Sequence, residues 1–398
     1  MLIPYRYAVR MLSTEDRVHA HHLRRAALLA LRGHGGAEPN PMVGCVIVSR
    51  GGAGETVGWG YHREVGGPHA EIVALKRAGS RARGATLYCT LEPCNHHGRT
   101  GPCSQAVIDA GVREVIIARR DPWSVAAGGL ERIAAAGIQT RVIDACAIAS
   151  GVSEPFAHRL TTGLPWVTVK WAQTIDGRIA TRPPHNESQW ISNESSRRMV
   201  HRERGRVDAI MTGIGTVLKD DPLLTPRGVR LRRPAQRRPP RGMPIRVVID
   251  PHLQTPPAAK IVSTTHDAPT IIVCAQALVD ADDDRVQALR SRGVEIVGVS
   301  MTGDELPLEP VLKDLSSRRE VAHVLVEAGT GLMSRLFRQR LVNEAWIFTA
   351  PLLLGDEQAQ AAVTGMTTAR LTDGIAMQLW SLRRRGGNVI SRCIVSAG

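Results

Sequence analysis

The sequence predicts an α/β protein with two domains, and three observations lead to this fold class. The chain has 398 residues, which exceeds the usual size of one compact core. Apolar, β-branched runs alternate with segments of helical spacing. A new series of strands begins near Pro165, so we place the domains at 17–164 and 165–398. Hydrophobic residues make up 43% of the chain, so each half can bury a core.

The first half alternates between predicted strands and helices. The segment 69–79 has helical spacing, and a second helix leads to Gly137. Apolar runs predict strands at 42–49, 85–93 and 112–120 and directly after Gly137. We expect residues 1–16 to form a disordered extension.

The second half opens with a strand in which Val167, Val169 and Trp171 alternate with other residues. The spacing of the later strands leaves room for crossover helices, which favours a mostly parallel sheet. These strands are predicted at 207–213, 245–250, 269–275, 294–299, 322–329 and 343–351.

The chain is strongly basic, with a formal net charge of +14. Basic charge can indicate nucleic-acid binding, but much of it falls between Arg230 and Arg241. Three prolines make that segment a loop instead of a recognition helix. We interpret it as a solvated insertion, with attraction of an anionic substrate as the next alternative, and we expect no nucleic-acid partner.

Cysteine usage and hydropathy bear on the location of the protein. Seven cysteines are spread over both halves, an odd number that does not suit a disulfide framework. No window of about 18 apolar residues lacks a charge, so no membrane span is expected. The N-terminal segment has no apolar core typical of a secretory signal. We therefore expect a cytoplasmic protein.

The strongest chemical pattern is His69-Ala-Glu71 followed by Cys94 and Cys103. One imidazole and two thiolates suit zinc and leave a fourth position for water, which is typical of a catalytic site. Zinc lowers the pKa of such a water towards ~7. The carboxylate of Glu71 can carry protons to the attacked ring and to the departing amine. The pattern thus predicts hydrolytic deamination of a nitrogen heterocycle.

The H-x-E…P-C pattern is that of zinc nucleobase and nucleoside deaminases. Their second half is usually C-x-x-C, whereas here eight residues separate Cys94 from Cys103. One alternative is that His96 or His97 replaces Cys103 as a ligand. Another is a purely structural zinc ion.

At this point the sequence resembles the bifunctional riboflavin biosynthesis deaminase–reductases of bacteria. The first half shares segments like PNPMVGCVIV, GYHREVGGPHAE and EPCNHHGRTGPC. The second half shares segments like KWAQTIDGRIA, SQWISNESSR, DAIMTGIGTVLKDDPLLTPR and LVEAGTGL. The resemblance covers about residues 20–360. It implies a cytidine-deaminase-like α/β/α layer followed by a dihydrofolate-reductase-like α/β domain.

The resemblance also implies two consecutive reactions. The first domain would deaminate 2,5-diamino-6-(5-phosphoribosylamino)pyrimidin-4-one with Zn²⁺, and the second would reduce the ribose of the product to ribityl with NADPH. A homodimer through the reductase domain is implied as well. The implied zinc ligands are His69, Cys94 and Cys103, with Glu71 as the proton carrier.

Binding residues follow from the same resemblance. Substrate contacts in the deaminase would be Asn40 and His62. The cofactor would meet Ala172, Trp190, Thr216, Asp220 and the turn containing Gly329, Thr330, Gly331 and Arg335. The reductase substrate would meet Ser188, Arg204, Leu224, Arg227 and Glu327.

The residues themselves support part of this assignment. The segment 322–337 reads as strand, glycine turn and helix, and amides at such a helix start bind phosphate. Arginines such as Arg204 and Arg227 can bind a phosphate dianion in a bidentate manner. Gly213-Ile-Gly215 lacks the third glycine of a Rossmann fingerprint.

The sequence departs from the family pattern at several positions. Gly101 replaces a usual proline, and the loop 121–129 differs from the DPNP type. Ala328 replaces the first of two glycines, which would cost about 1 kcal/mol if that position requires positive φ. Two alternative functions follow: a working deaminase with a degenerate reductase half, or an RNA-editing nucleobase deaminase.

Overall fold

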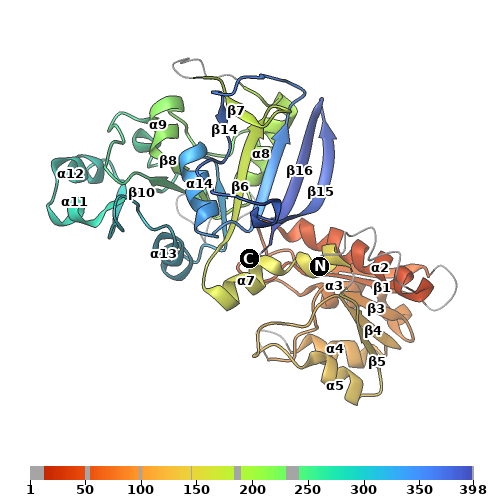
Figure 1. The fold of residues 1–398 in the computed structure, drawn as a ribbon. Helices are drawn as coiled ribbons and strands as arrows, with labels where there is room; N and C mark the ends of the chain where they lie inside the picture. Colours follow the sequence, from red (N-terminus) through yellow and green to blue (C-terminus); the bar gives the residue numbers. More distant parts are fainter. Residues whose placement is uncertain are drawn as a thin grey trace. The chain divides into compact units, whose positions relative to one another are not determined.

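The computed structural model describes residues 13–49, 54–97, 101–144, 146–182, 190–229 and 242–396. The chain divides into two compact units, Met1–Thr162 and Gly163–Gly398, which are described separately (Figure 1). The basic loop 230–241 predicted from the sequence and the site residue Ser188 lie outside the described residues. No helix in the described part of the chain is long and apolar enough to cross a membrane.

The first unit is built on a five-stranded sheet of order β2-β1-β3-β4-β5. Strand β1 pairs antiparallel with β2 and β3, whereas β3, β4 and β5 are parallel. The strands are β1 (Gly44–Val48), β2 (Thr56–Tyr61), β3 (Thr86–Cys89), β4 (Glu114–Ile117) and β5 (Gln139–Val142). The predicted strands of this half are therefore present, each shorter than the apolar run that indicated it.

Helices cover both faces of this sheet. Alternate side chains of the central strands point to opposite faces, so Cys45 and Ile47 join one hydrophobic cluster and Val46 and Val48 the other. Helices α3, α4 and α5 pack on the first face, and α2 and α6 on the second (Figure 1). The helices are α2 (Thr14–Ala30), α3 (Ala70–Ala78), α4 (Cys103–Asp109), α5 (Gly129–Ala135), α6 (Ala147–Gly151) and α7 (Glu154–Thr162), with 3₁₀ turns η1 (Leu31–Gly33) and η2 (Gly79–Ala82). The expected α/β/α layering is confirmed.

The expectation that residues 1–16 form a disordered extension is wrong for its last residues. The Ser13 side chain accepts a hydrogen bond from the Asp16 amide and caps the N-terminus of α2. This helix then buries a stripe of apolar residues at helical spacing, namely Leu23, Ala26, Ala27 and Ala30. Such a cap is a short polar pattern, which apolar periodicity does not reveal.

The second unit contains a nine-stranded sheet of order β11-β10-β9-β8-β12-β6-β13-β16-β15. Its first seven strands are parallel, which confirms the expected mostly parallel sheet. The strands are β6 (Trp166–Gln173), β8 (Ala209–Gly213), β9 (Ile245–Ile249), β10 (Thr270–Ala275), β11 (Glu295–Val299), β12 (His323–Val326), β13 (Glu344–Thr349), β15 (Met377–Arg385) and β16 (Asn388–Val395).

The antiparallel hairpin β15–β16 closes one edge of this sheet and was not predicted. Strand β15 alternates exposed polar and apolar residues, so its sequence lacks the apolar run that marked the other strands. A separate two-stranded sheet pairs β7 (Arg178–Ala180) with β14 (Gln360–Ala361).

Crossover helices cover the two faces of the large sheet. One hydrophobic cluster includes residues of α13 and α14, and the other includes residues of α8, α9, α10 and α12. The helices are α8 (Glu194–Arg204), α9 (Ile214–Asp220), α10 (Lys260–Ser263), α11 (Gln276–Asp280), α12 (Asp284–Arg290), α13 (Glu309–Arg319) and α14 (Thr330–Arg338), with a 3₁₀ turn η4 (Leu371–Asp373). Because parallel strands share their direction, the carboxyl ends of neighbouring β8, β12 and β6 meet at one edge.

Candidate active sites

The predicted metal ligands of the first unit come from two helix starts and one loop. His69 is the N-cap residue of α3, and Cys103 is the first residue of α4. Cys94 lies in the loop after β3, and its Sγ accepts the backbone N–H of Cys103 at 3.5 Å. Helix α3 can begin this close to β2 because Gly60 has no side chain: a Cβ there would lie 2.3 Å from the Ala70 carbonyl oxygen. Hydrogen bonds from Cys103 and His69 lower the pKa of the Cys94 thiol, which favours its thiolate.

The three side chains form a donor set that fits zinc. The Nδ1 atom of His69 lies 3.5 Å from Sγ of Cys94 and 3.2 Å from Sγ of Cys103. Tetrahedral zinc with ordinary Zn–N and Zn–S bonds separates such donors by about 3.5 Å. Among the described residues, these three form the group of metal-binding side chains whose ligand atoms all lie within 4.8 Å of one another.

Glu71 lies two residues after His69, in the first turn of α3, and only 3% of its surface is exposed. Burial raises the pKa of its carboxyl to about 7. A carboxyl group with such a pKa can accept and release protons near neutrality. The placement of Glu71 beside the donor set therefore suits the proton transfers that a hydrolytic deamination needs.

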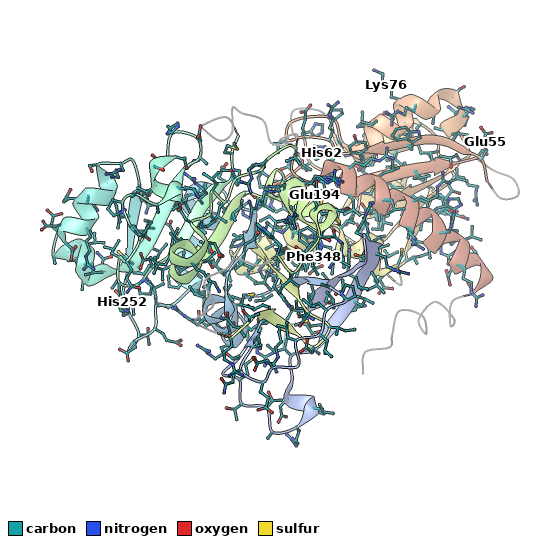
Figure 2. All side chains as sticks on the ribbon, turned by 90° about the horizontal axis from the view of Figure 1, so that it is seen from above. Glu55, His62, Lys76, Glu194, His252 and Phe348 are labelled. Carbon is teal, nitrogen blue, oxygen red and sulfur yellow. The ribbon has the colours of Figure 1, made fainter. Side chains whose placement is uncertain are left out.

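His62, which Figure 2 labels, lies beside this donor set and uses only one of its two ring nitrogens in a hydrogen bond. Its ring centroid is 5.5 Å from that of His69, and its Nδ1 lies 3.2 Å from the Pro68 carbonyl oxygen. Its Nε2 is buried and has no hydrogen-bond partner among the described residues. Burial lowers the pKa of His62, which favours the neutral ring. An unpartnered buried nitrogen is a natural contact for a substrate.

Asn40, the other predicted substrate contact, is half-buried in the loop before β1. Its backbone N–H donates to the Ala37 carbonyl at 3.0 Å. A buried pair braces this loop: Nδ1 of His34 lies 2.5 Å from Oε1 of Glu38, whose other oxygen accepts the Gly35 N–H at 2.8 Å.

Glu92 has a structural role that was not predicted from the sequence. This buried carboxylate accepts three backbone N–H groups, from Asp121, Gly128 and Leu130, at 3.0–3.2 Å. It thereby fixes both ends of the loop 121–129, whose Ala126 packs with Cys94 and Cys103. An acid directly before the Pro-Cys of the ligand loop was a visible signal.

His96 and Trp123 lie against each other at the rim of this region. Their ring centroids are 5.4 Å apart in an edge-to-face arrangement, and Trp123 is 41% exposed. The structure thus places His96 against the 121–129 loop and leaves it out of the group of His69, Cys94 and Cys103.

In the second unit, the predicted substrate residues Arg204 and Glu327 pair with each other. The guanidinium of Arg204 donates to both carboxylate oxygens of Glu327, at 2.6 and 2.9 Å. Both side chains are largely buried.

Lys170 was not predicted, although a lysine inside the apolar strand β6 was a visible signal. Its ammonium lies 5.6 Å from the ring centroid of Phe348, which Figure 2 labels, and interacts electrostatically with Glu327.

The loop after α9 carries two further predicted substrate residues. Leu224 has a positive φ of 48°, which is unusual for a side chain of this kind. Its side chain is 2% exposed and belongs to a hydrophobic cluster, so its backbone is the part that can meet a ligand. Arg227 is exposed, and its guanidinium makes no hydrogen bond or ion pair with the described residues.

The predicted cofactor residues gather at the carboxyl ends of adjacent strands. Ala172 lies at the end of β6, Thr216 and Asp220 lie in α9 directly after β8, and Gly329 caps α14 shortly after β12. This edge of a parallel sheet is where such folds bind ligands. Trp190 is 70% exposed, and the guanidinium carbon of Arg197 lies 4.9 Å from its ring centroid.

Two side chains near the turn at Gly329 already form hydrogen bonds within the protein. The Thr330 hydroxyl donates to the Ala361 carbonyl, and the Arg335 guanidinium donates to the Leu306 carbonyl at 2.7 Å. Gly331 is exposed in the first turn of α14. Ala328 does not belong to the described non-glycine residues with positive φ. The backbone there suits alanine, so the strain considered for this position does not arise.

Comparisons with known families match both units. Residues 16–119 match a family model described as the cytidine and deoxycytidylate deaminase zinc-binding region. Residues 165–390 match a model described as the RibD C-terminal domain.

Relatives with the same organisation cover most of the chain. The riboflavin biosynthesis protein RibD of Escherichia coli (strain K12) is 37% identical over 93% of this chain and 97% of its own length. That of Aquifex aeolicus is 36% identical over 85% of this chain and 88% of its own. The solved structure of Acinetobacter baumannii RibD (form 1) has 31% identity and a TM-score of 0.74, and covers 96% of this chain and 100% of its own.

A second solved structure also covers nearly the whole chain. It is a diaminohydroxyphosphoribosylaminopyrimidine deaminase/5-amino-6-(5-phosphoribosylamino)uracil reductase from Thermotoga maritima. It is 26% identical, with a TM-score of 0.73, and covers 96% of this chain and all of its own.

Proposed function

This chain belongs to the RibD family, the bifunctional deaminase–reductases of riboflavin biosynthesis, and on that premise we propose which residues and which cofactors serve each reaction. Both domains of the family are present, and the chain is a deaminase and reductase with a zinc-binding deaminase domain. The finer assignments below rest on the geometry of the two sites.

For the first reaction, we propose 2,5-diamino-6-(5-phosphoribosylamino)pyrimidin-4-one as the substrate and the set His69, Cys94 and Cys103 as the zinc site. The spacing of these donors beside the buried Glu71 is the single observation that supports this most strongly. A zinc ion held there would polarise a water molecule and so supply the nucleophile. Glu71 takes up the proton from the nucleophile and delivers protons to the ring nitrogen and the departing amine.

Two neighbouring groups orient the pyrimidine. His62 offers its unpartnered Nε2 to the ring of the substrate, and burial lowers the pKa of His62, which favours the neutral imidazole. Asn40 approaches from the loop that the His34–Glu38 pair holds in place. Substrate hydrogen bonds to such buried polar groups discriminate against analogues that lack the matching atom.

For the second reaction, we propose that NADPH reduces the ribose of the deaminated product to ribityl. NADPH supplies the hydride. Residues at the carboxyl ends of β6, β8 and β12 would hold the cofactor, namely Ala172, residues of α9 and the start of α14, and the exposed Trp190 would be a further contact. The exposed amides at the N-terminus of α14 are suited to cofactor phosphate.

The substrate of this reaction meets a buried cluster of charges. Glu327 is hydrogen-bonded to Arg204 and interacts electrostatically with Lys170, so two basic side chains accompany one carboxylate. Because Arg204 already binds Glu327 through two nitrogens, Arg227 is the better candidate for the substrate phosphate. Its exposed guanidinium, which is unpaired among the described residues, can bind a phosphate in a bidentate manner.

We also propose a homodimer through the second unit and a cytoplasmic location. Strand β15 is an edge of the nine-stranded sheet and exposes Leu379 and Leu382 at 54% and 61%. Such an apolar edge is suited to pairing with a second copy. All seven cysteines are free, as is usual in a reducing compartment.

The experiment that tests the reductase assignment is NADPH oxidation, followed by absorbance, with either the deaminated or the aminated pyrimidine supplied. We expect oxidation with the deaminated compound and a far lower rate with NADH in place of NADPH. Absence of NADPH oxidation in a protein whose deaminase works would favour the alternative of a degenerate reductase half.

A further inference from the structure

Arg246 is a completely buried arginine whose partners are neutral oxygens. Its guanidinium donates to the carbonyls of Leu223, Thr264 and Ala268 and to the Thr264 hydroxyl, at 2.7–3.2 Å. Its exposed fraction is 0%. Burial lowers its pKa to about 10, and the electrostatic influence of Asp267 only partly opposes this. A buried cation with no bonded carboxylate is costly. Its hydrogen bonds connect the backbone of Leu223 to Thr264 and Ala268.

One of these contacts reaches the proposed substrate loop. Nη1 of Arg246 donates to the Leu223 carbonyl at 3.2 Å, and Nη1 of Arg204 donates to the Thr225 carbonyl at 3.2 Å. The residue between these two carbonyls is Leu224, whose φ is 48°. A left-handed leucine persists only where its surroundings over-determine it. The two arginines supply that constraint, one on each side.

The start of this loop, directly after α9, is held by a separate contact. The Asp221 carboxylate accepts the backbone N–H of Lys260 at 2.7 Å and lies 3.3 Å from its ammonium. Among the described residues, the other hydrogen bonds of Arg246 go to Thr264, the C-cap residue of α10, and to Ala268, neither of which lies at this end. The loop is therefore held at three points, of which Arg246 and Arg204 control the part around Leu224.

We propose that Arg246 is a positioning residue of the reductase: it holds the Leu223 carbonyl and so fixes the backbone of Leu224 where the deaminated substrate binds. This inference rests on the proposed function, since it assumes that Leu224 meets that substrate. Arg246 itself does not touch substrate or cofactor. Its loss should therefore weaken substrate binding and leave the binding of NADPH unchanged.

The test compares Arg246→Met, Arg246→Lys and the control Thr264→Val in the full-length protein. Thr264→Val removes the hydroxyl that accepts from Arg246 at 2.8 Å but keeps the bond to Leu223. We expect Arg246→Met to raise the KM for the deaminated substrate about ten-fold or more, the effect of one charge-assisted hydrogen bond. The dissociation constant for NADPH and the deaminase rate should stay at the wild-type value. Arg246→Lys should recover part of the KM.

Thermal unfolding reports the structural cost in each variant. Arg246→Met and Thr264→Val should both lower the stability, but only the first should shift the KM. An unchanged KM in Arg246→Met, or a parallel loss of NADPH affinity, would overturn the proposal. If Arg246→Met does not fold, the KM for the deaminated substrate and the dissociation constant for NADPH are measured on Arg246→Lys instead. A wild-type protein without reductase activity would instead refute the proposed function on which this inference rests.

Discussion

Arg204 and Glu327 form a two-point ion pair, with Nε to Oε1 at 2.6 Å and Nη2 to Oε2 at 2.9 Å. Arg204 ends α8, and Glu327 follows β12. The pair therefore joins a helix on one face of the sheet to the edge where the cofactor and the substrate are proposed to bind. Because Glu327 already binds Arg204, we expect Arg204 mainly to stabilise the unit and Arg227 to bind the substrate phosphate.

Arg204→Ala should destabilise the second unit, because the buried Glu327 carboxylate loses the two hydrogen bonds from Arg204. Removing one partner of a buried pair costs about 3–5 kcal/mol. Chemical unfolding followed by fluorescence measures this loss, and the reductase rate should fall with it. A stable Arg204→Ala protein with only a raised KM would show that Arg204 acts mainly on the substrate.

Arg227→Ala should behave differently, because Arg227 is exposed and unpaired among the described residues. The variant should keep wild-type stability and raise the KM for the deaminated substrate about 10- to 150-fold, the equivalent of a charge-assisted bond to a dianion. Steady-state kinetics on substrate with and without its phosphate provides the control. An equal KM for Arg227→Ala and wild type would move the phosphate contact elsewhere.

Cys103→Ser should remove most of the zinc, since Cys103 supplies one of three protein ligands in the proposed site. Wild-type protein is expected to carry about one zinc per chain. Metal analysis of the purified variant measures the change, and Cys146→Ser serves as a matched control away from the donor set. Full zinc content in Cys103→Ser would return His96 or His97 to consideration as a ligand.

Glu71→Gln should keep its zinc and its fold and lose deamination by about 10²- to 10⁴-fold, the usual contribution of a general acid–base group. Glutamine has nearly the same volume and cannot carry the proton. The variant should still reduce deaminated substrate supplied from outside, because the reductase residues lie in the other unit. Retention of more than about a tenth of the wild-type deamination rate would contradict the role of Glu71.

Ala328→Gly should change NADPH affinity by less than about two-fold, because the alanine does not occupy a left-handed conformation. A titration of NADPH fluorescence measures the affinity of both proteins. Clearly tighter binding by the glycine variant would mean that the alanine side chain obstructs the cofactor.

The sequence predicted the layout of both units because buried parallel strands leave a strong apolar pattern. The runs around Val247 and Val324 are examples, since both residues lie in the sheet core with 0% exposure. Helix α2, the hairpin β15–β16 and the strands β2, β7 and β14 were not predicted. Helix α2 combines its narrow apolar stripe with many charged residues, and β15 exposes most of its side chains.

The candidate sites were predictable to the extent that motif residues come together in space. His69 and Cys103 are separated by a helix, a strand and a loop, yet their ligand atoms lie 3.2 Å apart. The hydrogen-bond partners of the buried arginines were not predictable. Nothing in the sequence showed that Arg204 binds Glu327, or that Arg246 reaches Leu223, because such bonds depend on where loops and strand ends meet in three dimensions.

The most direct test of the account is to incubate the purified full-length protein with the aminated pyrimidine substrate, with and without NADPH, and to follow the products by mass spectrometry. Without NADPH, we expect one product whose mass shows an amine exchanged for oxygen. With NADPH, we expect a second product that has gained two further hydrogens. A protein that leaves the substrate unchanged in both reactions, while carrying its zinc, would contradict the assignment of the first site and with it the central claim.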